Sequence, residues 1–368
     1  MRIGVPKEIK DQEFRVALTP GAVGQLVAKG HQVTIERGAG AGAGFSDQDY
    51  QRQGAAIATT PEEIFAQELV LKVKEPLPQE YKWLHDRLIL FTYLHLAASR
   101  ELTVALLESG CSAFAYETVQ LDNGQLPLLT PMSMIAGRLA TQFGSHLLTK
   151  QQGGMGLLLG GIPGVRPGRV VILGGGTVGT EAAKIAVGLG ARVQILDISI
   201  DRLNELSQLF GARVELLYSN PSTISEVIPA ADLVIGAVLV PGQRAPVLVS
   251  RELVRQMQPG AVIVDVAVDQ GGCIATVRPT SHSQPTYVEE GVLHYGVPNM
   301  PGAVPWTATQ ALVNATLPYV LQLAEGLDYL DRYPILKRGL NIYQKKIVHP
   351  VIAQVFPDLA SWEGLSDH

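Results

Sequence analysis

Short apolar runs alternate with helically spaced segments along the first third of the chain. The runs predict buried strands at Arg2–Val5, Val33–Glu36, Leu69–Val73, Leu88–Thr92 and Ser112–Tyr116. Helical spacing predicts helices over Gly21–Lys29 and Ser99–Ser109, with Ser99 as the N-cap of the second. Strands that are apolar throughout and separated by helices favour a parallel sheet with helices on both faces.

The same alternation resumes after Pro131 and predicts a second α/β segment. A long amphipathic helix is expected over Met132–Thr149, followed by a glycine-rich linker at Gly153–Gly168. The elements expected beyond the linker are Arg169–Leu173 (strand), Thr177–Gly188 (helix), Arg192–Leu196 (strand), Arg202–Phe210 (helix), and apolar runs at Leu233–Ala237 and Val262–Val266. We therefore expect an α/β protein with two Rossmann-like, doubly wound parallel-sheet domains separated by a cleft.

The segment Thr307-Ala308-Thr309-Gln310 has the spelling of a capping box and predicts a helix that reaches about Glu325. This helix does not resemble another sheet crossover. We expect it to cross back and pack, with the C-terminal tail, on the first domain. The predicted domains are 1–130 with 307–368, a discontinuous substrate and catalytic domain, and 131–306, which binds the nucleotide.

Composition then narrows the class of protein. Of 368 residues, 46% are hydrophobic and 17% charged, which excludes a disordered chain and suits more than one domain. The net charge of -5, with no dense run of Lys or Arg, argues against a nucleic-acid partner. No apolar run reaches the roughly 18 residues that span a bilayer, and the first residues contain no apolar signal core. Cys111 and Cys273 lie far apart and outside any Cys/His cluster, so we expect reduced thiols, no metal and a cytoplasmic location.

A glycine motif predicts a dinucleotide site. Gly174–Gly179 has GxGxxG spacing, follows an apolar strand, opens a helix, and precedes Asp197 by close to the expected distance of about 20 residues. Gly174 permits the sharp turn, Gly176 lets the pyrophosphate approach the backbone, and Gly179 lets the helix pack closely on the strand. The first amides of the helix would then face the phosphates.

The acid at the end of the second strand favours NAD over NADP. Asp197 would accept hydrogen bonds from the ribose hydroxyls and would repel a 2′-phosphate. Arg202 is an opposing signal, because a nearby guanidinium can bind that phosphate. The acid sits at the strand tip itself, so we predict NAD as the cofactor.

Four titratable side chains lie where strands end, which is where ligands of open α/β sheets bind: Arg15, Lys74, His95 and Asp269. Each also has an ordinary structural interpretation, as an exposed cation, a hydrogen-bonded buried histidine or a turn-capping aspartate. Together they fit the oxidation of an α-amino acid. A guanidinium suits the carboxylate, an imidazole shuttles protons near neutral pH, and an ammonium stabilises charge on oxygen.

Several segments resemble the alanine dehydrogenase family, and the resemblance covers essentially the whole chain. They are Arg2–Glu8, Lys72–Pro76, Thr92–Leu96, Gly174–Gly179, Asp265–Gly272 and Val297–Gly302, of which the histidine-containing Thr92–Leu96 is the most specific. The resemblance implies NAD-dependent, reversible oxidative deamination of L-alanine to pyruvate and ammonia by a homohexamer.

The resemblance also implies roles for individual residues. Arg15, Lys74 and Asn299 are expected to bind the substrate, and His95 and Asp269 to form the acid–base pair. The implied cofactor contacts, besides the glycines, are Ser133, Thr177, Val178, Asp197, Arg202, Ser219, Val238, Leu239, Val266, Ala267, Val268, Arg278, Val297, Pro298 and Met300. Two positions depart from the family pattern: Ser199 replaces an expected Asn, and Trp306 stands where a basic residue is common.

Alternative functions remain open at this point. The NAD(H)-binding subunit of a nicotinamide nucleotide transhydrogenase shares the N-terminal and glycine-loop patterns, although His95 in its Tyr-Leu-His setting favours amino-acid chemistry. A dehydrogenase for lysine, saccharopine or another amino acid is a second alternative. A non-catalytic sensor of the NAD redox state is a third.

Overall fold

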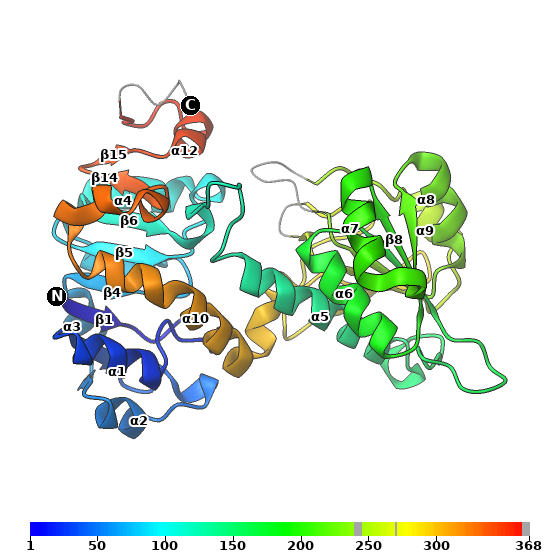
Figure 1. Ribbon diagram of the computed structural model, residues 1–368, viewed down its shortest axis with the longest axis horizontal. Coiled ribbons are helices and arrows are strands. Elements are labelled where there is room, and N and C mark those ends of the chain that lie inside the picture. The colour runs from blue at the N-terminus through cyan, green and yellow to red at the C-terminus, as the bar shows by residue number, and fades with distance from the viewer. Residues whose placement is uncertain (239–244, 269–270, 363–368) are drawn as a thin grey trace. The chain divides into compact units, whose positions relative to one another are not determined.

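Figure 1 shows the computed structural model, which describes residues 1–238, 245–268 and 271–362. The chain divides into two compact units. Unit 1 consists of Met1–Met132 and the chain from Gly302 onward, and unit 2 of Ser133–Pro301. The sequence-based division set its boundaries after residues 130 and 306, and the roles that it assigned to the two domains stay predictions.

Unit 1 contains an eight-stranded sheet in the order β15-β14-β6-β5-β4-β1-β2-β3. Its parallel strands are β1 (Arg2–Val5), β2 (Gln32–Glu36), β3 (Ala56–Ala58), β4 (Leu69–Leu71), β5 (Ile89–Thr92) and β6 (Ser112–Ala115). Two antiparallel strands extend it, β14 (Leu340–Tyr343) and β15 (Lys346–Ile347). The five predicted strands are confirmed, whereas β3, β14 and β15 were not expected, because they are short and weakly apolar.

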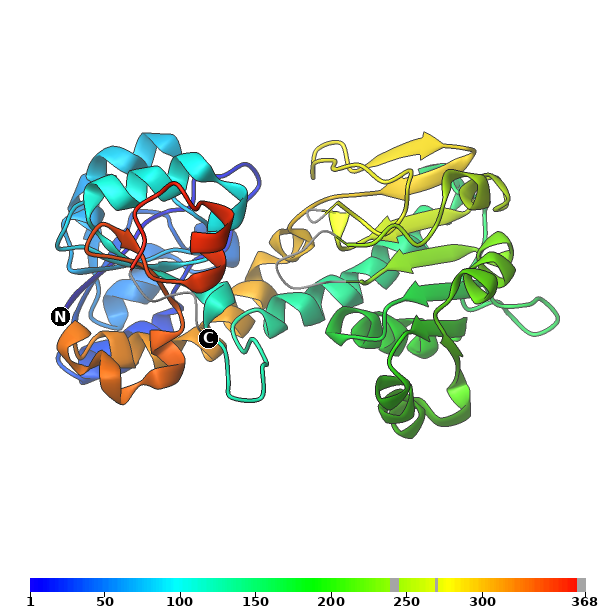
Figure 2. The ribbon, with the colours of Figure 1, turned by 90° about the horizontal axis from the view of Figure 1, so that it is seen from above.

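Helices cover both faces of this sheet, as Figure 2 shows for α4 on one side and α1 on the other. The helices of unit 1 are α1 (Pro20–Ala28), α2 (Asp47–Arg52), α3 (Pro61–Phe65), α4 (Arg100–Ser109), α10 (Pro305–Leu323), α11 (Pro334–Lys337) and α12 (Pro350–Val355). Its 3-10 helices include η2 (Pro78–Trp83), η3 (Leu96–Ala98), η4 (Tyr116–Thr118) and η10 (Leu327–Arg332). Leu102 and Leu106 of α4 pack with Ile64 of α3 and Leu90 of β5 in one fully buried core. The predicted N-cap is confirmed, since the Ser99 hydroxyl accepts the Leu102 N–H at 3.3 Å.

The predicted capping box at Thr307 is wrong. Helix α10 begins at Pro305, with Val304 as its N-cap residue and no side-chain cap. Proline suits the first helical position, because its φ is already helical and its missing N–H has no partner there. The Thr309 hydroxyl instead accepts the backbone N–H of Val16 at 3.2 Å and ties α10 to the loop between β1 and α1.

Unit 2 contains a seven-stranded sheet in the order β12-β13-β11-β10-β7-β8-β9. The parallel strands are β7 (Arg169–Leu173), β8 (Arg192–Asp197), β9 (Val214–Tyr218), β10 (Leu233–Gly236), β11 (Val262–Asp265) and β13 (Val292–Tyr295), and β12 (Thr286–Glu289) pairs antiparallel with β13. The helices are α5 (Thr130–Leu147), α6 (Thr177–Gly188), α7 (Ile200–Phe210), α8 (Pro221–Val227) and α9 (Arg251–Arg255). The predicted fold class, two mostly parallel sheets with flanking helices, is confirmed; β9, β12 and β13 were not expected.

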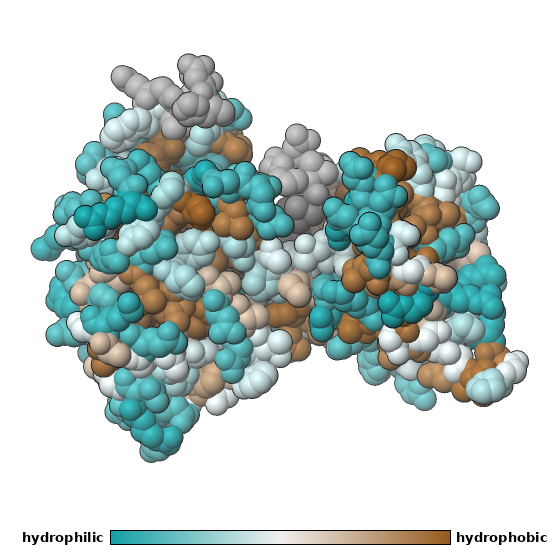
Figure 3. Space-filling model, viewed as in Figure 1, coloured by the Kyte–Doolittle hydropathy of each residue, from teal (hydrophilic) through white to brown (hydrophobic). Residues whose placement is uncertain are grey.

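Both units expose some apolar side chains, and the two cysteines are buried. Figure 3 shows apolar areas among the polar ones on both units, and between α5 and β7 the side chains of Leu158, Ile162 and Val165 are each more than half exposed. Cys111 and Cys273 are buried free thiols, as expected. No helix in the described part of the chain has the length and apolarity to cross a membrane.

Candidate active site and nucleotide site

Unit 1 brings together three of the predicted site residues at one edge of its sheet. Arg15 lies in the loop after β1, Lys74 after β4 and His95 after β5, and these strands are neighbours in the order β5-β4-β1. Because the strands are parallel, their carboxyl ends meet at the same edge. Burial, and then the charge of Arg15, lower the pKa of Lys74, so the two cations interact.

Arg15 is held by a neighbouring carboxylate. Its side chain is 2% exposed, its Nε donates to Glu13 Oε1 at 2.7 Å, and its Nη2 donates to Oε2 at 2.5 Å. The same Oε1 accepts the backbone N–H of Arg15 at 3.1 Å. Burial disfavours the charged form, but the hydrogen bonds and charge of Glu13 outweigh it and raise the pKa of Arg15. This bidentate pair fixes the plane of the guanidinium, and the interpretation as an exposed cation is wrong.

Lys74 is only 9% exposed, and its backbone is fixed from two sides. Glu8 Oε1 accepts the N–H groups of Val73 at 2.6 Å and of Lys74 at 3.2 Å. The Thr92 hydroxyl donates to the Lys74 carbonyl at 2.9 Å. An exposed solubilising lysine does not have these contacts, so that interpretation is wrong here too.

Beneath Lys74 lies a buried charge cluster. Lys72 Nζ donates to Glu80 Oε1 at 2.9 Å and to Glu8 Oε2 at 3.3 Å, and none of the three side chains is more than 3% exposed. Burial alone would lower the pKa of Lys72, but the two carboxylates outweigh it and raise it. The cluster therefore anchors Glu8, which in turn holds the end of β4.

His95 occupies an unusual backbone conformation with an accessible side chain. Its φ of 50° and ψ of 38° are left-handed, and 45% of its side chain is exposed. Glu117, in η4 after β6, accepts its N–H at 2.6 Å through Oε1. The Tyr93 ring lies nearly parallel to the imidazole, at 9° and 5.9 Å between centroids, and the Tyr93 hydroxyl donates to the Leu128 carbonyl at 2.6 Å. His95 is thus not a hydrogen-bonded buried histidine.

The sequence reasoning missed Glu8, Glu13 and Glu117. Each of these carboxylates accepts backbone N–H groups at the end of a strand or in the loop that follows it. Glu8 and Glu117 follow strands at the same edge as Arg15, Lys74 and His95. An acid a few residues beyond a buried strand was the available signal.

In unit 2 the glycine loop connects β7 to α6 as predicted. Gly174 has a φ of 97°, and a Cβ there would lie 2.7 Å from the Ala237 carbonyl oxygen. A Cβ at Gly179 would lie 1.9 Å from the Gly174 oxygen, so both glycines are required by packing. Among the described residues, no atom lies within 4 Å of a Cβ built at Gly176, which leaves room beside the N-terminus of α6, including Thr177 and Val178.

Asp197 and Arg202 are both tied to the glycine loop. Asp197 Oδ2 accepts the Gly175 N–H at 2.7 Å, and Oδ1 accepts the Ser199 N–H at 2.8 Å. Arg202 Nε donates to the Gly175 carbonyl at 2.8 Å, and its Nη2 donates to the Thr180 hydroxyl at 2.8 Å. Ser199 caps α7 by accepting the Arg202 N–H at 3.2 Å.

The other predicted cofactor residues lie mostly at the carboxyl ends of the unit 2 strands. Ser219 follows β9, Val238 follows β10, Val266–Val268 follow β11 and Val297–Met300 follow β13. Ser133 lies in α5, and Arg278 rests over the Tyr287 ring at 4.1 Å from its centroid. Asn299 has a left-handed φ of 60°. The predicted Asp269 and Leu239 lie outside the described residues.

The loop after β11 has its own carboxylate. Asp265 is fully buried and accepts the N–H groups of Ala267 at 2.9 Å and Cys273 at 2.8 Å. It therefore holds both ends of the segment in which Asp269 falls. Within the described ranges, His, Cys, Asp and Glu form no group of three or more that could hold a metal ion.

Two parallel-sheet units, one with a glycine loop between β7 and α6 and an acid at the end of β8, define a two-domain α/β protein with a nucleotide-binding domain. The models for the N-terminal and C-terminal domains of alanine dehydrogenase/PNT match residues 4–136 and 140–350. The chain belongs to the alanine dehydrogenase/PNT family.

Individual relatives agree with this assignment. The alanine dehydrogenase of Bacillus subtilis is 53% identical over 96% of this chain and 94% of its own, and that of Geobacillus stearothermophilus is 54% identical over 96% of each. A solved L-alanine dehydrogenase has a TM-score of 0.96 at 63% identity, covering 98% of this chain and 100% of its own. A transhydrogenase from Sinorhizobium meliloti has a TM-score of 0.81 at 24% identity, over 95% and 99%, and shares the fold.

Proposed function

We propose that the chain is an NAD-dependent alanine dehydrogenase that converts L-alanine reversibly to pyruvate and ammonia. The observation that carries the proposal is the buried pair Arg15 and Lys74 at neighbouring strand ends, beside the accessible imidazole of His95. Burial and the charge of Arg15 both lower the pKa of Lys74, so an anion that binds beside Lys74 would offset this penalty on its charged form. The carboxylate of an α-amino acid is such an anion, and the alanine dehydrogenase relatives make L-alanine the substrate to test first.

The nucleotide site fits NAD. Gly174 and Gly179 form a close turn, Gly176 leaves space for a pyrophosphate, and Asp197 lies at the end of β8 where the ribose hydroxyls would reach it. Arg202 could oppose this choice only if its guanidinium turned toward a 2′-phosphate. It is instead bonded to the Gly175 carbonyl and the Thr180 hydroxyl, which supports NAD over NADP.

Each protein group has a part in the proposed mechanism. NAD, when bound, supplies the acceptor for the hydride of the alanine Cα. Arg15 binds and orients the substrate carboxylate, and Asn299 is the further substrate contact that the family resemblance implies. Lys74 stabilises negative charge that develops on the substrate oxygen.

Water must then add to the oxidised Cα–N bond, and ammonia must leave. We assign to His95 the removal of the water proton and its delivery to the departing amine, because its imidazole is accessible and histidine is the side chain that most often serves as a general acid and base. Asp269 stays the predicted second acid–base group. The amine must be neutral before the hydride departs, so alkaline pH should favour deamination.

The test is NADH formation with purified protein and a panel of amino acids. We expect L-alanine with NAD to give the highest kcat/KM. Activity confined to lysine or another long amino acid would point to a different dehydrogenase. Hydride exchange between NADH and an NADPH analogue, without amino-acid turnover, would point to the transhydrogenase alternative.

Assembly and location are further parts of the proposal. A homohexamer, which the family resemblance implies, would cover apolar side chains such as Leu158, Ile162 and Val165, which a monomer exposes. Sedimentation analysis should then give six times the mass of the chain, and a monomer would contradict the assembly. We expect the protein in the cytoplasm, without a nucleic-acid or membrane partner.

A further inference from the structure

The backbone at His95 needs an explanation. Its left-handed φ of 50° and ψ of 38° are sparsely populated by residues that carry a Cβ. Such a conformation persists only where the surrounding structure holds it in place, and it is common at functional sites. The imidazole direction depends on this turn, because the Cα–Cβ bond is fixed by the backbone.

Glu117 supplies the contacts that hold the turn. Strand β6 pairs with β5 so that Ala115 lies opposite Thr92, which places Glu117 beside the backbone that leads to His95. Glu117 Oε1 accepts the His95 N–H at 2.6 Å and the Leu94 N–H at 3.1 Å, and Oε2 lies 3.3 Å from the same Leu94 nitrogen. Successive N–H groups converge on one anion in such turns, and bonds to an ionised acceptor are the stronger kind.

We propose that Glu117 is a positioning residue, which fixes the left-handed turn at His95 and thereby the direction of the imidazole. Its Oε1 lies 4.0 Å from His95 Nδ1, beyond hydrogen-bond distance although within reach of a protonated imidazole, so its hydrogen bond to His95 is made to the backbone N–H. The Glu117 side chain is 18% exposed and that of His95 45%, so the carboxylate that holds the turn is shielded from solvent while the imidazole is accessible. The kinetic consequence rests on the proposed function; the conformational consequence does not.

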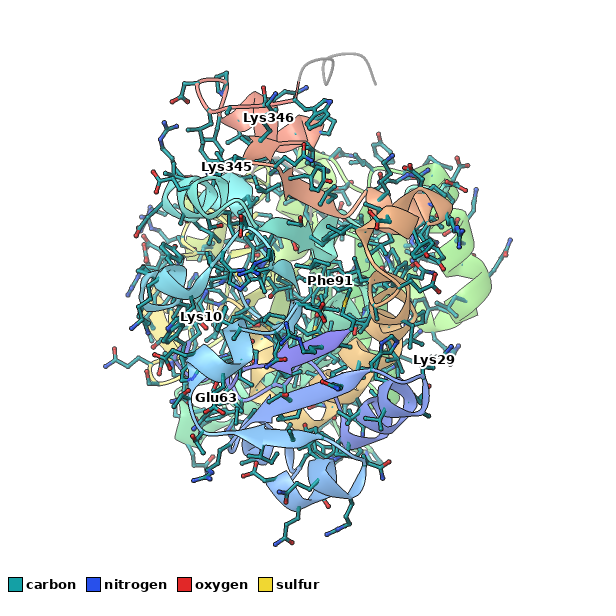
Figure 4. The ribbon with its side chains drawn as sticks, turned by 90° about the vertical axis from the view of Figure 1, so that its left-hand side faces the viewer. Lys10, Lys29, Glu63, Phe91, Lys345 and Lys346 are labelled. Atoms are coloured by element: carbon teal, nitrogen blue, oxygen red, sulfur yellow. The ribbon has the colours of Figure 1, made fainter. Side chains whose placement is uncertain are left out.

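A matched control exists in the same unit. Glu63, labelled in Figure 4, accepts the N–H groups of two consecutive residues, Thr59 and Thr60, at 3.2 Å each, where it caps α3. Figure 4 shows it well apart from Phe91, which lies on β5, the strand that leads to His95. Glu63→Ala therefore removes the same kind of carboxylate from the same kind of backbone pair, away from the site.

The experiment compares Glu117→Ala, Glu117→Gln and Glu63→Ala in alanine oxidation. We expect Glu117→Ala to lower kcat roughly 100-fold, because a shift of about 1 Å in a reacting group costs that much. KM for L-alanine and NADH affinity should change little. Glu117→Gln should recover most of the lost turnover, since its amide oxygen still accepts both N–H groups, and Glu63→Ala should keep the kcat of the unaltered protein.

Several outcomes would overturn the proposal. One is a Glu117→Ala protein whose kcat matches that of Glu63→Ala. Another is a Glu117→Gln protein as inactive as Glu117→Ala, which would show that the charge matters and not the backbone contacts. If Glu117→Ala does not fold, Glu117→Asp replaces it, since its shorter side chain cannot reach both N–H groups; full activity would contradict the positioning role.

A crystal structure separates this proposal from the proposed function. In Glu117→Ala, or in Glu117→Asp, His95 should leave the left-handed region, whichever substrate the protein uses. If His95 keeps its φ near 50° there, the Glu117 contacts are not needed to hold the turn and the proposal fails. If the unaltered protein forms no NADH from L-alanine, the proposed function fails, and the conformational test still stands.

Discussion

The pair between Glu13 and Arg15 allows a quantitative prediction. Both side chains are almost completely buried, at 0% and 2% exposed, and Glu13 accepts three hydrogen bonds from Arg15. Glu13→Ala leaves the guanidinium buried without this carboxylate. Two charge-assisted bonds at about 1.5 kcal/mol each and one backbone bond at about 1 kcal/mol together give about 4 kcal/mol. Removing one partner of a buried ion pair in other proteins costs about 3–5 kcal/mol, which agrees with the sum over the three hydrogen bonds.

The assay is urea unfolding followed by circular dichroism, with the Arg15→Met, Glu13→Ala and double variants forming a cycle. We expect each single variant to lose free energy of unfolding, with Glu13→Ala losing about 4 kcal/mol. The double variant should lose less than the sum, because no charge is left unpaired. Strictly additive losses, or a Glu13→Ala variant within about 1 kcal/mol of the unaltered protein, would refute the reasoning.

Three further predictions follow from the sites. Asp197→Asn should lower the preference for NAD over NADP at least tenfold in kcat/KM, because one ribose contact at about 1.5 kcal/mol is lost and the repulsion of a 2′-phosphate is removed; an unchanged ratio would contradict the ribose role. His95→Ala should lower turnover steeply while NADH binding, measured by fluorescence, stays nearly intact; lost NADH affinity with normal turnover at saturation would contradict it. Burial raises the pKa of the Cys111 thiol from 9.0 to about 11. Between these pH values the unfolded chain releases the thiol proton and the folded protein keeps it, so the free energy of unfolding is unaffected below pH 9 and decreases by up to about 3 kcal/mol as the pH rises to about 11. The urea midpoint should therefore decrease less between pH 8 and pH 11 in Cys111→Val than in the unaltered protein. An equal decrease in both proteins would exclude the thiol as a cause.

The sequence predicted the repetitive part of this fold well. Strands such as Arg169–Leu173 could be predicted, because a strand that is buried on both faces forms a continuous apolar run in the sequence. Strands β3 and β15 were missed, since two or three residues at a sheet edge carry too little apolar signal, and β14 was missed because Asn341 interrupts its short apolar run. The start of α10 was placed at Thr307, whereas the helix begins at Pro305 without a side-chain cap. The partner of the Thr309 hydroxyl, the backbone of Val16, lies more than 290 positions away and is not visible in the local sequence.

For the candidate site, the sequence predicted which residues take part but not how the fold positions them. Arg15, Lys74 and His95 could be found because strand ends are visible in the sequence and their residue types suggest chemistry. The burial of Arg15 and Lys74 could not be predicted, since it depends on the order of β5, β4 and β1 in the sheet. The backbone that carries Lys74 and His95 is fixed by acceptors far along the chain, 65 positions for Val73 and Glu8 and 22 for His95 and Glu117, whereas Arg15 is held by the nearby Glu13.

These acceptors share a physical cause. Where a parallel strand ends, its last N–H groups lose their neighbours in the sheet, and a buried unpaired N–H is costly. Bulk water would satisfy them at the surface, but Val73 is completely buried. Carboxylates at Glu8, Glu117 and Asp265 satisfy such groups and at the same time fix the backbone that carries Lys74 and His95, and the ends of the segment containing Asp269. The same contact that removes an energetic penalty thus orients the proposed chemistry. Substitutions at these acids should therefore reduce stability and turnover together, whereas His95→Ala should reduce turnover alone.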